Sequence, residues 1–135
     1  MERNEKTRAL LAAFGCALAY LLAGKALTAV LPQVPEEAAR MWAFVHRCAA
    51  APIVEELVFR GIIQQLARPL GERQAVALQA VLFAVQHRGP AGMAYALVCG
   101  LVLGTIRSRT GSVWPGMLLH LSLIHISEPT RPLYI

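Results

Sequence analysis

The stretch Ala51-Pro-Ile-Val-Glu-Glu-Leu-Val-Phe-Arg-Gly61 decides how the rest of the chain is interpreted, because it places three charges inside an apolar run. Glu56 and Arg60 are four residues apart, so on a helix they share a face and can pair. Glu55 lies about 100° round the helix from Glu56, and the pairing of Glu56 leaves Glu55 free. At membrane depth each charged side chain costs roughly 2.5–3.5 kcal/mol. Three charges in a membrane helix would therefore indicate function.

The composition favours a membrane protein over a soluble domain. Of the 135 residues, 56% are hydrophobic and 16% are charged, and the mean hydropathy is +0.50. Soluble domains carry about 25% charged residues. The net charge of +5 does not indicate nucleic-acid binding, because the basic residues form no stripe with interleaved aromatic residues. Cys16, Cys48 and Cys99 are far apart in apolar surroundings, which predicts buried thiols rather than a disulfide or metal framework.

Apolar runs separated by polar turns predict an all-α protein, a multi-span transmembrane helical bundle without strands. The first run, 9–31, is long enough to cross a bilayer, and a cleaved signal peptide is the alternative interpretation. Pro52 is expected to kink or restart the helix that contains the glutamates. The helices expected after the loop 32–40 are 41–67, 75–87, 91–106 and a last one that begins near Pro115, with Ser112 as N-cap, and runs at least through Leu121.

The positions of the basic residues predict the orientation of this bundle. Lys or Arg occurs in each of three segments, 1–8, 68–74 and 107–111. These segments fall on one side of the membrane if every helix crosses it. The positive-inside rule makes that side cytoplasmic. Arg88 is the exception, but the 75–87 helix is too short to have to reach the opposite surface.

Three ionisable side chains are expected at a similar depth in this bundle. At about 1.5 Å per residue, Glu55 and His87 lie roughly 18 Å, and His120 roughly 12 Å, from the cytoplasmic ends of their helices. A carboxylate and two imidazoles at one level suit direct activation of water, with the glutamate as general base and acid. They also suit a divalent metal such as zinc, with Glu55, His87 and His120 as candidate ligands. No H-E-x-x-H motif is present.

Each of these residues also has an ordinary structural interpretation. The glutamates and Arg60 can form the solvated face of an interfacial helix, His87 can be an interfacial histidine, and His120 can bond a carbonyl in the core. A transporter fragment whose charges line a path is a further interpretation, although no inverted repeat is visible. The agreement of the three positions in order and depth favours a common site.

The motifs E-E-x-x-x-R (Glu55, Glu56, Arg60) and F-x-x-x-H (Phe83, His87), followed by His120 in a late apolar helix, resemble the CPBP intramembrane endopeptidases. This family includes relatives of the type II CAAX prenyl protease and of bacteriocin-processing and self-immunity proteins. The resemblance implies a membrane-embedded protease. By that likeness Glu55 and His87 activate the attacking water, Glu56 and Arg60 orient the site, and His120 binds the oxyanion.

The resemblance also implies partners and a location. We expect a peptide or protein substrate, including prenylated proteins, together with membrane lipid, and a place in the bacterial plasma membrane. A metal such as zinc or no cofactor at all is compatible with the motifs. The alternative function is a non-catalytic bacteriocin-immunity or scaffold protein on the same bundle.

Two departures from the family pattern suggest that the chain is a fragment: position 124 does not hold asparagine, and only one obvious span precedes the glutamates, fewer than such proteins usually have. The late motif H-x-x-x-N has Ile124 in place of its asparagine, so we predict weak or no activity from this polypeptide alone. The final residues, LSLIHISEPTRPLYI, resemble a translated sequencing adapter, with an ordinary polar tail as the alternative. The expected organisation is an N-terminal transmembrane helix and loop (1–40), a protease-like core (41–120) and a non-native tail (121–135).

Overall fold

A computed structural model describes residues 2–30 and 35–127, and every regular element within them is helical. This confirms the predicted all-α class. The elements in chain order are α1 (Glu2–Val30), α2 (Glu36–Val45), η1 (His46–Ala50), α3 (Ala51–Glu55), η2 (Glu56–Ile63), α4 (Gln64–Leu66), η3 (Arg68–Leu70), α5 (Glu72–Ala84), α6 (Gly89–Thr110) and α7 (Trp114–Ser127).

The segments α2 to α4 form one uninterrupted helical rod, and Pro52 neither ends nor restarts it. Two stretches of the rod, η1 and η2, are π-helical. A proline ring inside an α-helix clashes with the carbonyl four residues earlier, and the wider turns of η1, directly before Pro52, relieve that crowding. The expected helix over 41–67 is therefore present, with its proline absorbed by a local widening.

Several boundaries differ from the sequence prediction because terminal charges extend the helices. Glutamates occupy the first turns of α2 and α5, which begin at Glu36 and Glu72 rather than after the expected turns. Arg107 and Arg109 lie in the last turn of α6, which ends at Thr110 instead of Ile106. Acidic residues near a helix N-terminus and basic residues near a C-terminus are stabilised by the helix dipole.

The connection between α6 and α7 is a short capped turn. Gly111 ends α6 with φ +70°, a left-handed conformation that glycine adopts without strain. The hydroxyl of Ser112 accepts a hydrogen bond from the Trp114 N–H at 3.3 Å. Ser112 therefore caps α7 as expected, although it lies one residue further from the helix than a standard N-cap.

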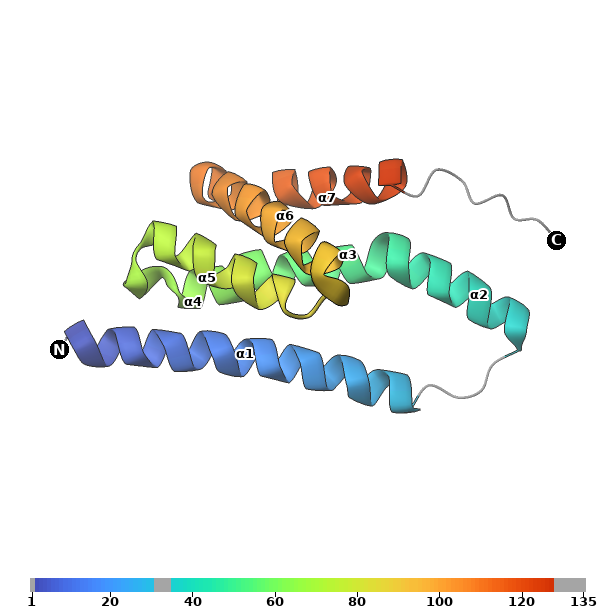
Figure 1. The fold of residues 1–135 in the computed structure, drawn as a ribbon, viewed down its shortest axis with the longest axis horizontal. Helices are drawn as coiled ribbons and strands as arrows, with labels where there is room; N and C mark the ends of the chain where they lie inside the picture. Colours follow the sequence, from blue (N-terminus) through green and yellow to red (C-terminus); the bar gives the residue numbers. More distant parts are fainter. Residues whose placement is uncertain (1, 31–34, 128–135) are drawn as a thin grey trace.

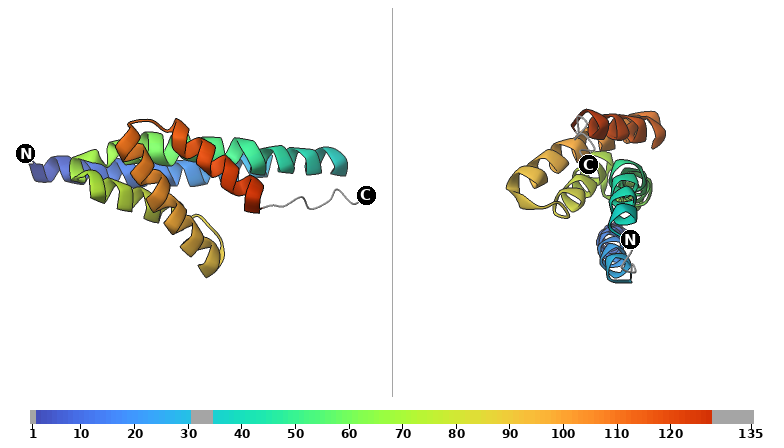
Figure 2. Two further views of the ribbon diagram at one scale, coloured as in Figure 1. Left: turned by 90° about the horizontal axis from the view of Figure 1, so that it is seen from above. Right: turned by 90° about the vertical axis from the view of Figure 1, so that its right-hand side faces the viewer.

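The rod α2–α4 lies between α1 on one side and α7 on the other, and the α5–α6 hairpin packs beside it (Figures 1 and 2). Three features lie at the same end of the molecule in Figure 1 and in the left view of Figure 2: the N-terminus of α1, the η3 turn and the α6–α7 connection. The three basic segments thus share one end, as predicted. Which side of a membrane that end faces stays a prediction.

Helices α1 and α6 are each long and apolar enough to cross a membrane. Most of α1 is exposed, including Leu11, Leu18 and Leu22, and only its alanines at positions 9, 13 and 17 are buried as a stripe against the bundle. Because α1 is apolar on all sides, its packing face is selected by small side chains and not by polarity. Two such helices support a membrane location but do not by themselves establish a multi-span bundle.

Helix α6 packs closely on α5 and on the rod through a contact that we call the glutamine seam. The seam consists of Gln64 of α4, Gln79 of α5, and Gly100 and Gly104 of α6. The amide nitrogen of Gln79 donates to the carbonyl of Gly100 at 2.7 Å, and that of Gln64 donates to the carbonyl of Gly104 at 3.0 Å. A Cβ at Gly100 would lie 2.9 Å from the Cα of Ala80, so only glycine permits this approach. The seam holds α6 to both α5 and the rod.

The seam continues outward through hydroxyl and carboxylate groups. Gln64 donates to the hydroxyl of Ser108 at 3.0 Å, and Ser108 donates in turn to the carboxylate of Glu72. Arg68 lies 3.4 Å from the same carboxylate. The hydrogen bond from Ser108, helped by the charge of Arg68, lowers the pKa of Glu72 below its usual value.

Candidate functional site

The centre of the candidate site is a buried ion pair on the rod. Glu56 and Arg60, 0% and 1% exposed, pair at 3.2 Å between Oε1 and Nη1, as their spacing predicts. The wide turns of η2 keep residues four apart on neighbouring positions of one face. Both charges are out of contact with solvent, so each depends on the other for compensation.

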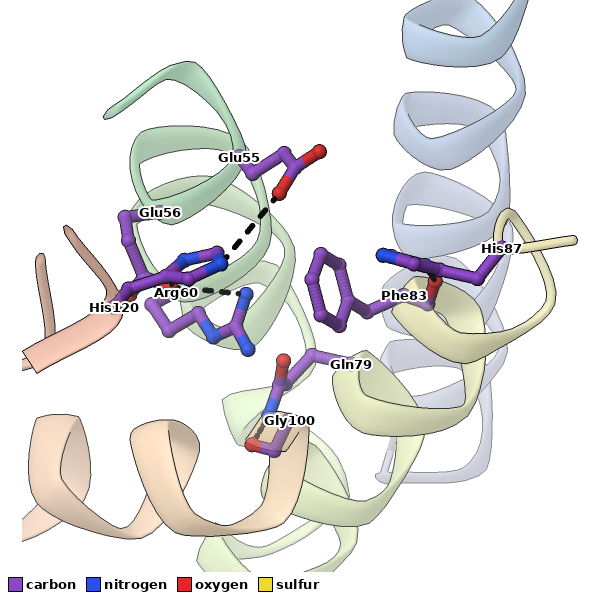
Figure 3. A network of polar contacts seen from close by, with 8 residues as sticks. All are labelled: Glu55, Glu56, Arg60, Gln79, Phe83, His87, Gly100 and His120. Carbon is purple, nitrogen blue, oxygen red and sulfur yellow. Dashed lines mark hydrogen bonds and ion pairs between the residues drawn. The ribbon is translucent and has the colours of Figure 1, made fainter. Parts of the chain in front are cut away.

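His120 joins this pair from α7. Its Nδ1 lies 2.9 Å from Oε1 of Glu56, and its Nε2 lies 4.0 Å from Oε2 of Glu55 (Figure 3). The Glu55 side chain remains 22% exposed, whereas that of Glu56 is fully buried. We call these four residues, Glu55, Glu56, Arg60 and His120, the charged cluster. The depth argument predicted that Glu55 and His120 lie near each other, whereas the closer contact of His120 with Glu56 was not predicted.

Phe83 on α5 organises the aromatic side of the cluster. The guanidinium carbon of Arg60 lies 4.4 Å from the centroid of the Phe83 ring. The same ring meets His87 at a centroid distance of 4.6 Å and His120 at 6.2 Å, both edge to face. Phe83 therefore lies between the two imidazoles and supports the cation with its π face.

His87 lies in the turn after α5, because that helix ends at Ala84 and not at His87 as expected. The backbone N–H of His87 still bonds the carbonyl of Ala84, at 3.0 Å, which continues the chain as a tight turn. Its Nδ1 lies 3.0 Å from the carbonyl oxygen of Phe83. A carbonyl can only accept, so Nδ1 carries the proton and the neutral ring keeps a lone pair on Nε2.

The α5–α6 turn that carries His87 stops about midway along the molecule in Figures 1 and 2. This agrees with the expectation that the short α5 does not reach the opposite surface. Figure 3 shows the imidazole of His87 on the far side of Phe83 from His120, with one ring nitrogen directed toward the side of Glu55. His87 thus borders the charged cluster without bonding to it.

The proposed metal ligands do not form a metal site in the described structure. Among residues 2–30 and 35–127, no group of three His, Cys, Asp or Glu side chains is placed to hold an ion. One nitrogen of His120 is engaged by Glu56 and one of His87 by a carbonyl. The Phe83 ring lies between the two imidazoles, so in this arrangement Glu55, His87 and His120 are not placed as three ligands of one ion.

Two contacts of the site were not predicted from the sequence. Gly116 of α7 lies against Glu56, and a Cβ there would be 3.2 Å from Oε2 of that glutamate. Gln79, fully buried one turn before Phe83, lies in the same region (Figure 3). A lone glutamine in the apolar run 75–87 was the signal for Gln79, whereas Gly116 had none beyond its helical position.

Ile124 lies one turn after His120 on α7 and is half-buried. The structure therefore places an apolar side chain where the family pattern has asparagine. Within the described residues, Oε2 of Glu56 and the guanidinium nitrogens of Arg60 have no hydrogen-bond partner. The charged cluster thus contains more hydrogen-bonding capacity than its protein neighbours use.

Comparisons with known proteins agree with these observations. The family model for type II CAAX prenyl endopeptidase Rce1-like proteins matches residues 37–123, which include the rod from its first turn and all the cluster residues. No curated protein and no solved structure matches the chain. Because the match covers more than half of the sequence, the chain belongs to the type II CAAX prenyl endopeptidase Rce1-like family.

Proposed function

We propose that this chain carries the active site of an intramembrane endopeptidase, which hydrolyses a peptide bond of a membrane-associated protein or peptide, prenylated proteins included. Family membership supports a CAAX protease-like activity. The nature of the substrate, the catalytic roles and the bacterial plasma membrane as location are part of the proposal.

The different surroundings of the two adjacent glutamates carry this proposal. Glu56 is fully buried and shared by Arg60 and His120, so its carboxylate is committed to holding the site. Glu55 has no partner closer than 4.0 Å among the ion pairs of the described residues, and it is partly exposed. Only Glu55 is therefore free to receive a proton from a water molecule.

In the proposed reaction, Glu55 takes a proton from water while the oxygen attacks the carbonyl carbon of the scissile bond. The lone pair on Nε2 of His87 accepts a hydrogen bond from the same water and orients it. Collapse of the tetrahedral intermediate breaks the C–N bond, and Glu55 returns the proton to the leaving amine.

His120 is suited to the opposite role, because its Nδ1 bonds the Glu56 carboxylate, which can only accept. When the ring carries its second proton, Nε2 becomes a donor that points to the Glu55 side of the cluster. We assign this donor to the developing oxyanion. Glu56 and Arg60 then act as positioning residues that fix the imidazole.

The test is cleavage of a prenylated reporter peptide by the chain inserted in bacterial membranes. Glu55→Gln and His87→Ala should each lower kcat/KM by at least about 100-fold, the usual contribution of acid–base catalysis. Glu37→Gln, at an exposed site on α2, is the matched control and should cleave as wild type does. Insertion is monitored by membrane fractionation.

Retained cleavage in both site variants would overturn the assignment. Protection against a bacteriocin that is equal in wild type and Glu55→Gln would instead favour the non-catalytic immunity function.

Since Ile124 replaces the expected asparagine, Ile124→Asn should raise the activity of the chain if His120 binds the oxyanion as proposed.

A further inference from the structure

Two buried side chains at the charged cluster, Gln79 and Arg60, lie on facing elements and have polar atoms without a hydrogen-bond partner among the described residues. Gln79 on α5 is 0% exposed, and while its nitrogen bonds Gly100, its oxygen Oε1 has no hydrogen-bond partner among the described residues. The Arg60 guanidinium on η2 is 1% exposed, and none of its nitrogens has a hydrogen-bond partner within the same part of the chain. Buried groups of this kind are rare in folded proteins.

The geometry brings this acceptor and these donors to the same place. Gln79 is four residues before Phe83, so both side chains leave α5 on one face. Phe83 uses that face to contact Arg60, at 4.4 Å from the guanidinium carbon. Figure 3 shows the Gln79 amide with its nitrogen turned to Gly100 and its oxygen directed toward Arg60.

The glycines of α6 fix the orientation of this amide. Gly104 leaves the space that the Gln79 nitrogen occupies, and a Cβ at position 104 would overlap with that nitrogen. Gly100 supplies the carbonyl that receives its hydrogen bond. The amide therefore cannot turn over without losing this bond, and its oxygen is held on the side of Arg60.

We propose that Gln79 is a positioning residue for Arg60, connected to the guanidinium through one ordered water molecule. A water that joins two buried groups is enthalpically almost as favourable as a direct bond. The resulting connection runs from the Gly100 carbonyl through Gln79 to Arg60, Glu56 and His120. It couples α6 to the helix that carries His120, and its catalytic consequence rests on the proposed function.

The structural part of the inference is tested without any assay of activity. Gln79→Leu, Arg60→Lys and the double variant are compared by thermal unfolding in detergent micelles. Lysine keeps the charge that compensates the buried Glu56 carboxylate but loses the guanidinium fork. We expect the Tm losses of the single variants to be clearly non-additive in the double variant, as for residues in one network.

Gln64→Leu is the control for the loss of a buried glutamine, because Gln64 also donates to a glycine carbonyl of α6. Gln64 lies one turn from Arg60 on the rod, so the control for additivity is Gln79→Leu combined with Arg68→Lys, at an exposed arginine that pairs with Glu72. The losses of that pair should be additive. Additive losses for Gln79→Leu with Arg60→Lys would overturn the inference. Gly104→Ala provides a second measurement, because its Cβ displaces the Gln79 amide. It should reduce the coupling energy between positions 79 and 60. An unchanged coupling energy would contradict the proposed position of the Gln79 oxygen beside Arg60.

The catalytic part is tested by kinetics on the reporter peptide. Gln79→Leu should lower kcat about tenfold with little change in KM, because a displaced Arg60 impairs the transition state more than substrate binding. Gln64→Leu should leave kcat unchanged. Equal kcat values for the two variants would overturn the positioning role. If neither the wild-type chain nor its Ile124→Asn variant cleaves, the proposed function fails, while the unfolding data still decide whether Gln79 is coupled to Arg60.

Discussion

The charged cluster and the glutamine seam both place polar groups in the interior, but they do so in different ways. The seam uses neutral amides that donate to backbone carbonyls, at 2.7 Å for Gln79 and 3.0 Å for Gln64. The cluster uses full charges, and one member, Glu55, remains partly exposed and without a close partner. The seam is thus suited to hold helices together, whereas the cluster leaves one carboxylate free for the proposed hydrolysis.

The difference has an energetic basis. Neutral amides lose less hydration on burial than charges do, so the seam can form wherever glycine lets the backbones approach. The buried ion pair of Glu56 and Arg60 gains little net stability, because desolvation offsets much of the attraction. Removing one of its members, however, leaves the other charge uncompensated. The charged cluster should therefore be the most sensitive region to single substitutions.

The largest effect is expected for Glu56→Ala, which leaves the buried Arg60 cation and the Nδ1 of His120 without their common acceptor. We expect a loss of about 3–5 kcal/mol in the free energy of unfolding. Denaturant titration in mixed micelles measures it, and Glu37→Ala at an exposed position is the control. A loss below about 1 kcal/mol would mean that the charge of Arg60 is compensated elsewhere.

A smaller effect is expected when the seam is forced apart. In Gly100→Ala the new Cβ would lie 2.9 Å from the Cα of Ala80, a backbone atom that cannot move alone. We expect a loss of about 1–3 kcal/mol, as for other overpacked interiors. At Gly92 on α6, the Cβ of an introduced alanine would lie 4.0 Å from its nearest neighbouring atom, which is an ordinary van der Waals contact.

Gly92→Ala should therefore have the opposite sign and stabilise the protein by about 0.5–1 kcal/mol, since alanine restricts the unfolded chain and favours helix. Differential scanning calorimetry of the two variants side by side gives the comparison. Similar Tm values for the variants at positions 92 and 100 would show that α5 and α6 are not in the tight contact described.

The smallest effect is expected at the outer end of the seam, where Glu72 accepts from Ser108. The pKa of Glu72 is lower in the folded protein than in the unfolded chain. Its carboxylate therefore contributes its full stabilisation at a pH above the unfolded-state pKa, and this stabilisation is lost as the pH falls through the folded-state pKa. Glu72→Gln should cost about 0.2–1 kcal/mol at pH 7, because the carboxylate is largely exposed. The difference from wild type should shrink as the pH falls and disappear once the carboxyl group is protonated in the folded protein as well. A difference that persists in acid would assign the effect to packing instead of charge.

Much of the candidate site was predictable because its residues differ sharply from their surroundings. Charges and imidazoles within apolar helices are costly, so Glu55, Arg60 and His120 were conspicuous in the sequence. Their spacing along helices also predicted the ion pair of Glu56 with Arg60. The catalytic roles of these residues and of His87 stay predictions until cleavage is measured.

Other features were not predictable because their cause is a neighbouring helix. The alanines of α1 that pack against the bundle are indistinguishable in polarity from the exposed leucines around them. The π-helical turns before Pro52 depend on backbone crowding, and the end of α5 before His87 depends on the following Gly89–Pro90 start of α6. The helices start earlier than predicted, at Glu36 and Glu72, and end later, at Thr110, because charges at their ends stabilise additional residues.

The amino-acid sequence alone determined that the chain is helical and apolar and that acidic and imidazole groups interrupt its apolar helices, because periodicity and hydration are local properties. The tertiary structure alone decided which glutamate is committed to Arg60 and His120 and which stays free. It also decided that Phe83 separates the imidazoles and that Gln79 faces Arg60. These outcomes depend on which helix faces meet, and that is set by close packing at Gly100, Gly104 and Gly116.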